Sequence, residues 1–278
     1  MFQLKIERTG TIVNRIVTIK SNDIEKSIKT KKILSENLIK RGFKVIDYLH
    51  EKTELIISIG GDGSFLKIVN TLEFTDKLFV GINTGHLGFF TDVTVEEIDK
   101  FIDLYISKSY IVQSLPILNT KIITEYREVN IYTINEVVIK CDKSKVIHAN
   151  INIDGNKIQK ISGDGIIIST PTGSTAHNYS ARGSIVDPSM NVIQLTSINH
   201  LNTNVYRSFS SSILFSFQSE LEVVPEYSFE KSMLIVVDGV EYKFERVIKI
   251  KTQMTNQKIN LFRMPNYNFW SRVSSKFL

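Results

Sequence analysis

The hydrophobic pattern divides the chain into two regions. Up to about residue 110, short apolar runs typical of buried strands alternate with segments whose apolar residues recur at helical spacing. The pattern predicts strands at 14–20, 44–48, 55–59 and 78–82, and helices from caps at 21–23 to about 42, from 65, and over 94–107. Strands that alternate with helices indicate a parallel sheet covered by helices. We therefore predict an α/β N-terminal domain.

After about residue 115, short β-branched runs are separated by turn residues. The apolar positions alternate over 147–153 and end at Asp154-Gly155, and the run 233–237 ends at Asp238-Gly239. Both Asp-Gly pairs predict two-residue hairpin turns, which is the role we assign to Asp154 and Asp238. Further strands are predicted at 130–140, 211–217, 246–251 and 258–263. This half is predicted to be a mostly antiparallel all-β sandwich.

These patterns predict three parts of the chain. Residues 1–114 form the α/β domain and residues 115–252 form the β-sandwich. Residues 253–278 form a C-terminal segment that could pack back on the N-terminal domain.

Composition narrows the class of protein. The chain has 278 residues, of which 42% are hydrophobic and 23% charged, as in ordinary globular proteins. No apolar run approaches the roughly 20 residues of a membrane helix, and Lys5, Glu7 and Arg8 interrupt any signal pattern. The single cysteine, Cys141, excludes an internal disulfide and a cysteine-rich zinc site. We expect a cytoplasmic protein without a membrane partner.

The net charge of +5 points to an anionic small molecule. Lysines crowd residues 20–44 and 140–160, but no aromatic residues are interleaved with them. This arrangement favours solvated faces over a nucleic-acid patch, so no nucleic-acid partner is expected.

The most informative segment is residues 59–66. An apolar strand stops at Gly60 and Gly61, Asp62 and Gly63 follow, and helical spacing resumes at Phe65. Glycines allow backbone N–H groups to approach an anion, and a helix N-terminus adds partial positive charge. The segment predicts a phosphate-binding turn, although a purely structural turn is the alternative. Asp62 would repel phosphate, but it makes sense if it faces a metal ion or the hydroxyl that attacks phosphorus.

A second loop, residues 83–90, follows the predicted strand 78–82. Open α/β sheets bind ligands at the carboxyl ends of their strands, where both loops would lie. Asn83 and Thr84 offer polar groups, and the glycines Gly85 and Gly88 allow close approach. Phe89 or Phe90 could lie against a base or could join the core.

Two further segments carry polar groups in apolar surroundings. Asn135 and Glu136 interrupt the run 131–139, where a carboxylate could accept ribose hydroxyls and an amide could bind an adenine edge. Because neighbouring strand residues face opposite ways, one of the two could simply face water. In the segment 163–176, Asp164 is a second candidate carboxylate, and the hydroxyl groups could cap a helix near Ala176 and bind phosphate or ribose. No two histidines have metal-ligand spacing, so we expect no metal site built by protein side chains alone.

Taken in order, these segments resemble the NAD kinase family. The motifs are GGDGSFL at 60–66, NTGHLGFF at 83–90, NE at 135–136 and GDGIIISTPTGSTAHNYSARGS at 163–184, within a similarity over about 16–251. The resemblance implies an N-terminal α/β domain and a C-terminal β-sandwich. It implies transfer of the ATP γ-phosphoryl to the 2′-hydroxyl of the adenosine ribose of NAD, giving NADP. It also implies a divalent ion such as Mg²⁺, polyphosphate as an alternative donor, and a homotetramer.

The resemblance also implies residue roles. Asp62 would accept the proton of the 2′-hydroxyl, and the glycines beside it would bind the triphosphate. The substrate-binding set implied or suggested by these motifs is Gly60, Gly61, Gly63, Asn83, Thr84, Gly85, Phe89, Asn135, Glu136, Asp164, Thr172, Thr175, Ala176, His177, Asn178, Tyr179 and Ser180. The chain departs from the common family pattern at Ser162, where an arginine is frequent, at His177, where a tyrosine is frequent, and at Gly239-Val240, where a Gln or His is frequent.

Two other functions are compatible with parts of the pattern. A lipid or sugar kinase of the same superfamily would use the Gly60 turn but would not need the 163–180 pattern. A catalytically silent NAD(P)-binding regulatory protein would explain the departures at Ser162 and His177, but retention of Asp62 argues against it.

Overall fold

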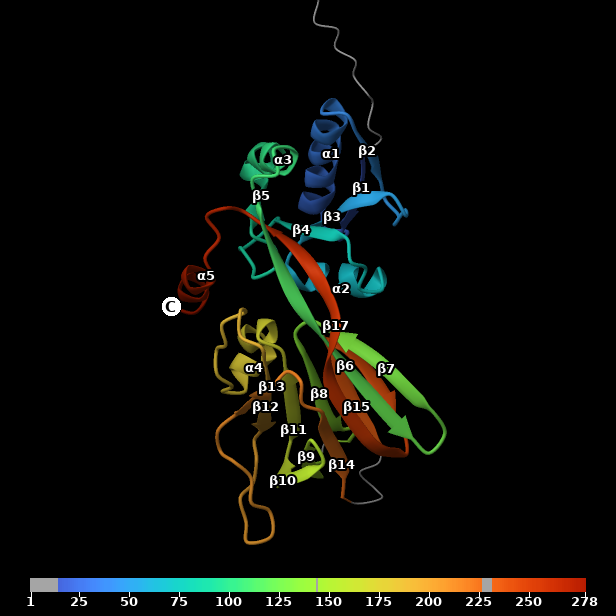
Figure 1. Cartoon of the computed structure of the whole chain (residues 1–278), viewed down its shortest axis with the longest axis vertical. Coiled ribbons are helices and arrows are strands. Elements are labelled where there is room, and N and C mark those ends of the chain that lie inside the picture. The colour runs from blue at the N-terminus through green and yellow to red at the C-terminus, as the bar shows by residue number, and fades with distance from the viewer. Residues whose placement is uncertain (1–14, 144, 227–231) are drawn as a thin grey trace, which may run out of the picture. The chain divides into compact units, whose positions relative to one another are not determined.

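The computed structural model describes residues 15–143, 145–226 and 232–278 (Figure 1). They form two compact units. Unit 1 comprises the described residues up to Phe65, Lys77–Ile111 and Phe262–Pro265, and unit 2 comprises Leu66–Asp76, Val112–Leu261 without the undescribed positions, and Asn266–Leu278. The three-part division predicted from the sequence stays a prediction.

Unit 1 contains a parallel sheet, as predicted. Its strands run in the order β2-β1-β3-β4, with β5 beside β4 and every pair parallel. The strands are β1 (Arg15–Ser21), β2 (Phe43–Ile46), β3 (Thr53–Gly60), β4 (Leu78–Asn83) and β5 (Val93–Thr94). Their apolar residues are buried on both faces, which is why the sequence reads as continuous apolar runs.

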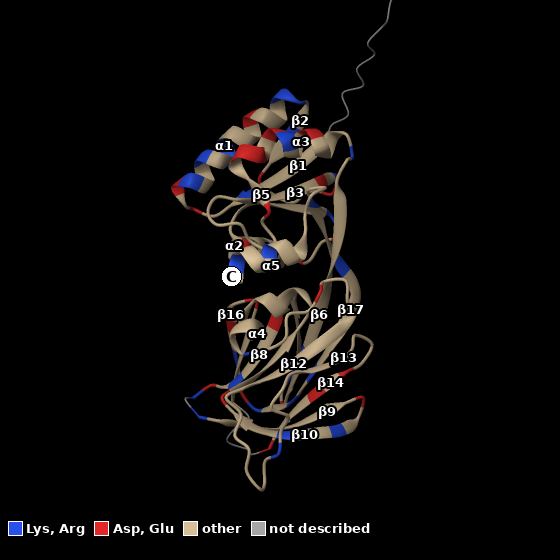
Figure 2. Cartoon of the chain, turned by 90° about the vertical axis from the view of Figure 1, so that its left-hand side faces the viewer, with Lys and Arg blue, Asp and Glu red and all other residues tan. Residues whose placement is uncertain are grey.

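Helices supply the apolar groups that bury this sheet. Leu34 and Leu38 of α1 (Glu25–Lys40) and Phe101 of α3 (Ile98–Ile106) belong to one buried cluster with strand residues. Phe65, in the first turn of α2 (Asp62–Thr71), packs instead against Phe79 of β4, with ring centroids 5.9 Å apart. Figure 2 shows that α1 carries charged residues of both signs along its length, in keeping with a solvated helix face.

One predicted helix start is confirmed, and another is wrong. Thr94 and Glu97 form the expected capping box at η1 (Val95–Glu97), which leads into α3. In contrast, α1 begins after Ile24 without a side-chain cap. Asn22 lies two residues before the cap position: its Oδ1 accepts from the Ile24 N–H at 3.3 Å, and its amide nitrogen donates to the Ser64 hydroxyl at 3.1 Å, beside the glycine turn.

Unit 2 is an antiparallel β-sandwich, as predicted. One sheet has the order β10-β9-β14-β17, with β6 pairing with β17 and β7, and the other has the order β13-β12-β11-β8-β15-β16. Apolar residues from both sheets form one buried cluster. The strands are β6 (Ile111–Thr124), β7 (Glu128–Thr133), β8 (Glu136–Cys141), β9 (Ile147–Ile153), β10 (Asn156–Gly163), β11 (Gly165–Ser169), β12 (Val192–Ile198), β13 (Ile213–Ser216), β14 (Leu221–Pro225), β15 (Met233–Val237), β16 (Val240–Phe244) and β17 (Val247–Arg263).

Three short helices complete the described chain. They are η2 (Thr172–Thr175), α4 (His177–Ser180) and α5 (Phe269–Phe277). None of the helices in the described ranges combines the length and apolar character that crossing a membrane would require.

Both predicted hairpin turns are present. Asp154 and Gly155 join β9 to β10, and Asp238 and Gly239 join β15 to β16, in each case with positive φ at both residues. This conformation matches the strand twist of a two-residue hairpin and explains the Asp-Gly sequences.

The strands β6, β12 and β14 were not predicted, and two of the predicted assignments differ from the structure. The two strands expected at 246–251 and 258–263 are one continuous strand, β17, whose last two residues belong to unit 1. The polar residues between them suggested a break, but Thr252 is buried and its hydroxyl lies 3.3 Å from that of Thr120. The single strand expected at 130–140 is divided into β7 and β8, with Ile134 and Asn135 between them.

Candidate active site

The glycine turn lies between β3 and α2, as the sequence predicts. Gly60 has φ 147°, and a Cβ there would lie 2.6 Å from the Ser64 hydroxyl and 2.8 Å from the Asn22 amide nitrogen. Only glycine fits this position. Gly61 and Gly63 are exposed, with no other atoms within 4 Å of a built Cβ. The turn therefore leaves open space at the N-terminus of α2, where an anion is favoured.

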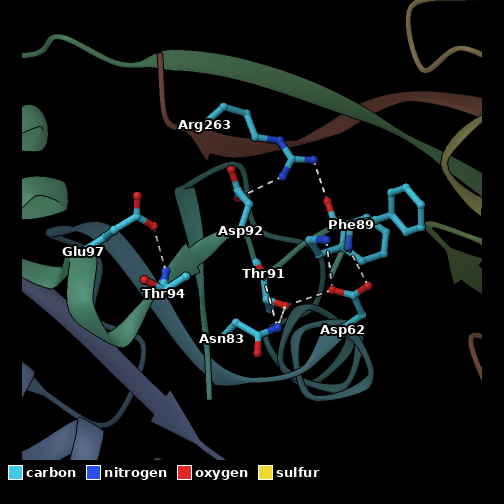
Figure 3. Close-up of polar contacts among 9 residues, drawn as sticks. Asp62, Asn83, Phe89, Thr91, Asp92, Thr94, Glu97 and Arg263 are labelled. Atoms are coloured by element: carbon cyan, nitrogen blue, oxygen red, sulfur yellow. Dashed lines mark hydrogen bonds and ion pairs between the residues drawn. The ribbon is translucent and has the colours of Figure 1, made fainter. Parts of the chain in front are cut away.

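The Asp62 side chain is fixed by the loop that follows β4 (Figure 3). Its Oδ2 accepts from the Phe89 N–H at 2.7 Å, and its Oδ1 accepts from the Phe90 N–H at 3.0 Å and from the Thr91 hydroxyl at 3.0 Å. Hydrogen bonds to a carboxylate are stronger than those between neutral groups. Asp62 and Phe89, which are 27 positions apart in the sequence, thus join two motifs through one side chain.

Gly88 makes this arrangement sterically possible. A Cβ on Gly88 would lie 1.9 Å from Asp62 Oδ1 and 2.4 Å from Asp62 Cγ, so the main chain of the loop directly contacts the carboxylate. The sequence predicts close approach at Gly88, but Gly88 is not in the substrate-binding set, and its contact with Asp62 was not predicted. The signal was a glycine between Leu87 and the two phenylalanines, whose packing the sequence alone does not show.

Asn83, predicted to contact a nucleotide, holds this loop closed. Its amide nitrogen donates to the His86 carbonyl at 2.7 Å and to the Thr91 hydroxyl at 2.8 Å, and its amide oxygen accepts from the Gly85 N–H at 2.6 Å. The side chain is buried, so its hydrogen-bonding groups serve the loop. A direct contact of Asn83 with a ligand stays a prediction.

The remaining residues of this loop have mixed environments. The Thr84 hydroxyl lies 3.0 Å from that of Ser27 in α1. Phe89 and Phe90 are both buried, and the Phe90 ring stacks on Phe65 with centroids 5.1 Å apart. This burial favours the core alternative for both phenylalanines.

In unit 2, a second polar cluster forms where β7 leads into β8. Asn135 and Glu136 are both buried, with exposed fractions of 6% and 7%. Asp238, in the turn between β15 and β16, accepts from the Ile134 N–H at 3.0 Å, from the Asn135 N–H at 2.9 Å and from the Thr133 hydroxyl. Asp238 thus fixes the corner that carries Asn135, a role beyond the hairpin turn that its sequence predicts.

The segment after β11 packs against the same corner. The Thr170 N–H donates to the Asn135 carbonyl at 2.9 Å, and the Thr172 hydroxyl donates to the Ile134 carbonyl at 3.0 Å. A Cβ on Gly173 would lie 2.2 Å from the Asn135 carbonyl oxygen. Two of the sequence motifs, 135–136 and 163–184, therefore meet within unit 2.

The corner contains acceptors that the described residues leave unsatisfied. Asn135 Oδ1 and Glu136 Oε2 are buried and have no hydrogen-bond partner among the described residues. Such groups cost free energy unless something donates to them. Burial, together with the nearby Asp238 carboxylate, raises the pKa of Glu136 to about 8. Burial also raises the pKa of Asp238. The corner is suited to a ligand that supplies hydroxyl or amino donors.

Comparisons with known proteins decide the family. The profile of the ATP-NAD kinase N-terminal domain matches residues 12–110, and that of the ATP-NAD kinase C-terminal domain matches residues 134–260. The NAD kinase of Finegoldia magna is 35% identical over 95% of this chain and 98% of its own length, and that of Streptococcus gordonii is 34% identical over 94% and 95%. The chain belongs to the NAD kinase family.

Solved structures of NAD kinases share the fold. Yeast NADH kinase complexed with NADH has a TM-score of 0.82 at 19% identity, covering 95% of this chain and 87% of its own. An NAD kinase from Archaeoglobus fulgidus in complex with ATP has a TM-score of 0.75 at 23% identity, covering 94% and 99%. The N-terminal profile contains the Asp62 turn and its loop, and the C-terminal profile contains the Asn135 corner.

The other predicted NAD kinase residues divide between a cavity and the protein interior. Asp164 is exposed, and its carboxylate accepts from the Asn199 amide at 2.8 Å. A cavity of about 460 Å³ lies nearby, lined by His177, Ser180, Ala181, Arg182, Thr196, Ser197, Ile198, Asn199, His200, Ser210, Ser211 and Ser212. Partial burial, with a smaller contribution from Lys140, lowers the pKa of His177. The imidazole that stands at the frequent tyrosine position is therefore mostly neutral at neutral pH.

Four residues next to His177 in the sequence are not among those that line the cavity: Thr175, Ala176, Asn178 and Tyr179. The buried Asn178 donates to Gln194 at 2.8 Å and accepts from the Thr196 hydroxyl at 2.7 Å, so its amide holds the interior together. Tyr179 packs on Phe277 of α5, with ring centroids 4.3 Å apart. Thr175 is buried, its hydroxyl donating to the Thr172 carbonyl at 3.2 Å, and Ala176 is half-buried.

The carboxylates near the glycine turn do not form a metal site of their own among the described residues. Among the described residues, no group of three or more His, Cys, Asp or Glu side chains could hold a metal ion. Asp62 is the carboxylate at the turn, and Asp92 is paired with Arg263. Mg²⁺ is commonly bound through one or two carboxylates together with substrate phosphates and water. The residues therefore fit a cation that is held mainly by a bound triphosphate.

We expect Gly88→Ala to disrupt the contact between the loop after β4 and the Asp62 carboxylate. The new methyl group overlaps the carboxylate, and overpacking of this kind lowers the free energy of unfolding by about 1–3 kcal/mol. Gly85→Ala is the matched control, since its Cβ would meet only Asn83 Oδ1 at 3.8 Å. Urea unfolding of the three proteins gives the comparison. Equal stability of the two variants would contradict the contact between Gly88 and Asp62.

We also expect a pH-dependent stability contribution from Glu136. Because its pKa in the folded state is raised to about 8, the folded protein keeps a proton that the unfolded chain releases above its ordinary pKa. The free energy of unfolding should therefore fall as pH rises from about 5 to 8. Glu136→Gln should reduce this fall, so the free energy of unfolding of the variant relative to that of the parent should rise with pH.

The control for this experiment is Glu128→Gln, which removes a half-exposed carboxylate paired with Lys121 on the surface. Thermal unfolding at several pH values measures all three proteins. A stability difference between Glu136→Gln and the parent that is constant from pH 5 to 8 would show that Glu136 titrates normally.

Proposed function

We propose that this protein is an NAD kinase that transfers the γ-phosphoryl group of ATP to the 2′-hydroxyl of the adenosine ribose of NAD, giving NADP. The observation that carries the proposal is the Asp62 carboxylate, held by three hydrogen bonds at a glycine turn that opens a helix. Membership of the NAD kinase family supports this reaction class.

The glycine turn binds the triphosphate of the donor. The backbone N–H groups of Gly61 and Gly63 are exposed at the start of α2, where the helix dipole favours negative charge. A divalent cation such as Mg²⁺, when bound with the triphosphate, neutralises charge that develops during transfer. Asp62 is the protein carboxylate that would approach this cation.

Asp62 orients the acceptor hydroxyl and takes its proton. A ribose hydroxyl is a much weaker acid than a carboxylic acid, so the proton moves late, as the bond to phosphorus forms. The carboxylate must therefore be aimed correctly before the reaction starts. Its hydrogen bonds to Phe89, Phe90 and Thr91 provide this orientation in advance.

The Asn135 corner binds donor groups of the dinucleotide. Asn135 Oδ1 and Glu136 Oε2 are buried oxygens without a described partner. The adenine amino group can donate to Asn135, and ribose hydroxyls can donate to Glu136 or accept from it, because its raised pKa keeps the carboxyl largely protonated at neutral pH. The relatives of known structure were solved with NADH and with ATP, which supports these two classes of substrate. Packing of the 170–173 segment on this corner also favours a dinucleotide over a lipid or sugar acceptor.

Two further properties complete the proposal. We place the enzyme in the cytoplasm and expect it to act as a homotetramer. Large apolar side chains of unit 2 are exposed in the isolated chain, among them Val205, Phe209 and Leu214. The edge strands β13 and β16 also present backbone groups that a second copy could pair with or cover.

The purified protein should form NADP from NAD, ATP and Mg²⁺, and Asp62→Asn should lower kcat by about 10²- to 10⁴-fold, as expected for loss of a general base. The Kd for NAD should change little. Asp99→Asn, which removes an exposed carboxylate from α3, is the control for charge. An Asp62→Asn enzyme with more than half the parent kcat would exclude Asp62 as the base. Binding of NAD without turnover by the parent would instead indicate a regulatory protein.

The homotetramer is tested separately. Light scattering at micromolar concentration should give a mass near four times 31.7 kDa. A fully active monomer at the same concentration would exclude the tetramer without affecting the proposed reaction.

A further inference from the structure

A buried ion pair lies behind the loop that holds Asp62. Arg263, the last residue of β17, and Asp92 each expose only 2% of their side chains. The Arg263 guanidinium donates to Asp92 Oδ1 at 3.0 Å and, through its other terminal nitrogen, to the Phe89 carbonyl at 2.7 Å. Both bonds are drawn in Figure 3.

Stability alone is a weak explanation for this pair. Removing two charges from water costs several kcal/mol, and apolar residues of similar volume often stabilise a fold equally well. One polar contact that the pair makes with the rest of the protein is the bond from Arg263 to the Phe89 carbonyl. This bond reaches the main chain of the loop on the side opposite Asp62.

One peptide group connects Arg263 to Asp62. The Phe89 carbonyl and the Phe90 N–H belong to the same planar unit. The carbonyl accepts from Arg263, and the N–H donates to Asp62 Oδ1 at 3.0 Å. A hydrogen bond to the carbonyl polarises the N–H at the other end and strengthens the bond that it donates. Fixing the carbonyl also fixes the direction of the N–H.

We propose that Arg263 is a positioning residue for phosphoryl transfer, which aims the Asp62 carboxylate through the Phe89–Phe90 peptide while Asp92 holds the guanidinium in place. The inference rests on the proposed role of Asp62 as the base. Arg263 lies outside both matched domain profiles, which end at residues 110 and 260. It acts on kcat through geometry and has no part in holding NAD.

The principal test replaces both charges together. Arg263→Met/Asp92→Leu leaves no buried charge unpaired, so the protein should remain folded. We expect kcat to fall about 10- to 100-fold, the size of effect that a small misplacement of a catalytic group produces. The KM for NAD should stay within about threefold. Arg41→Met is the matched control, because Arg41 pairs with Asp99 and Asp103 near the surface of the same unit.

A second measurement separates positioning from general destabilisation. Amide hydrogen exchange should accelerate in the segment 88–91 of the double variant, where the Phe90 N–H has lost its fixed direction, and should not change in β1 or β3. Arg263→Lys should give an intermediate kcat, since it keeps the charge but lacks the forked geometry that reaches two acceptors at once.

The outcomes distinguish the inference from the proposed function. A folded double variant with kcat within twofold of the parent would overturn the positioning role, whatever Asp62→Asn does. Should the double variant fail to fold, Arg263→Lys decides: a folded Lys variant with the parent kcat overturns the inference, and a several-fold loss supports it. If Asp62→Asn itself retains activity, Asp62 is not the base and the premise of the inference fails, whereas the proposed function fails only if the parent protein forms no NADP.

Discussion

The hydrogen bonds between Asp62 and the loop after β4 are the constraint on which unit 1 is built. A carboxylate that accepts from two backbone N–H groups and a hydroxyl can sit in one orientation only. The loop must then approach closely, which requires glycine at position 88. It must also keep its shape, which Asn83 secures by bonding to residues at both ends of it. The parallel pairing of β3 with β4 brings both segments to the same edge of the sheet.

In unit 2 a carboxylate also fixes a segment of main chain, but there it leaves side-chain acceptors unsatisfied. Asp238 satisfies the backbone N–H groups of the corner between β7 and β8, and Thr170 and Thr172 bond to its carbonyls. With the main chain satisfied, the side-chain acceptors of Asn135 and Glu136 are left in a buried position. The raised pKa of Glu136 reflects this burial. A rigid, well-bonded backbone thus holds polar side chains where water solvates them poorly.

Local sequence predicted the elements whose cause is local. The strand, glycine turn and helix over 53–71 follow from apolar spacing and three glycines, and the Asp-Gly hairpins follow from backbone conformation. The continuity of β17 was missed because its middle is polar, although distant partners such as Thr120 satisfy it. The Arg263–Asp92 pair joins residues 171 positions apart, so no window of sequence contains it. The identities of the motif residues were visible, whereas the direction of each side chain was not.

The hydrogen bonds inside the protein distinguish motif residues that fix a loop or helix from motif residues that keep an unsatisfied acceptor. Asn83 and Asn178 belong to the same motifs as the proposed ligand contacts, but each has its amide oxygen and nitrogen bonded inside the protein. These bonds fix the loop and the helix in which the two residues lie, and they account for part of the hydrogen-bonding capacity of each amide. Asn135 and Glu136 are equally buried, yet each keeps an acceptor without a described partner. A buried side chain with an unsatisfied acceptor gains most when a ligand donates to it, and on this ground we propose Asn135 and Glu136 as substrate contacts, whereas a ligand contact of Asn83 or Asn178 stays a prediction.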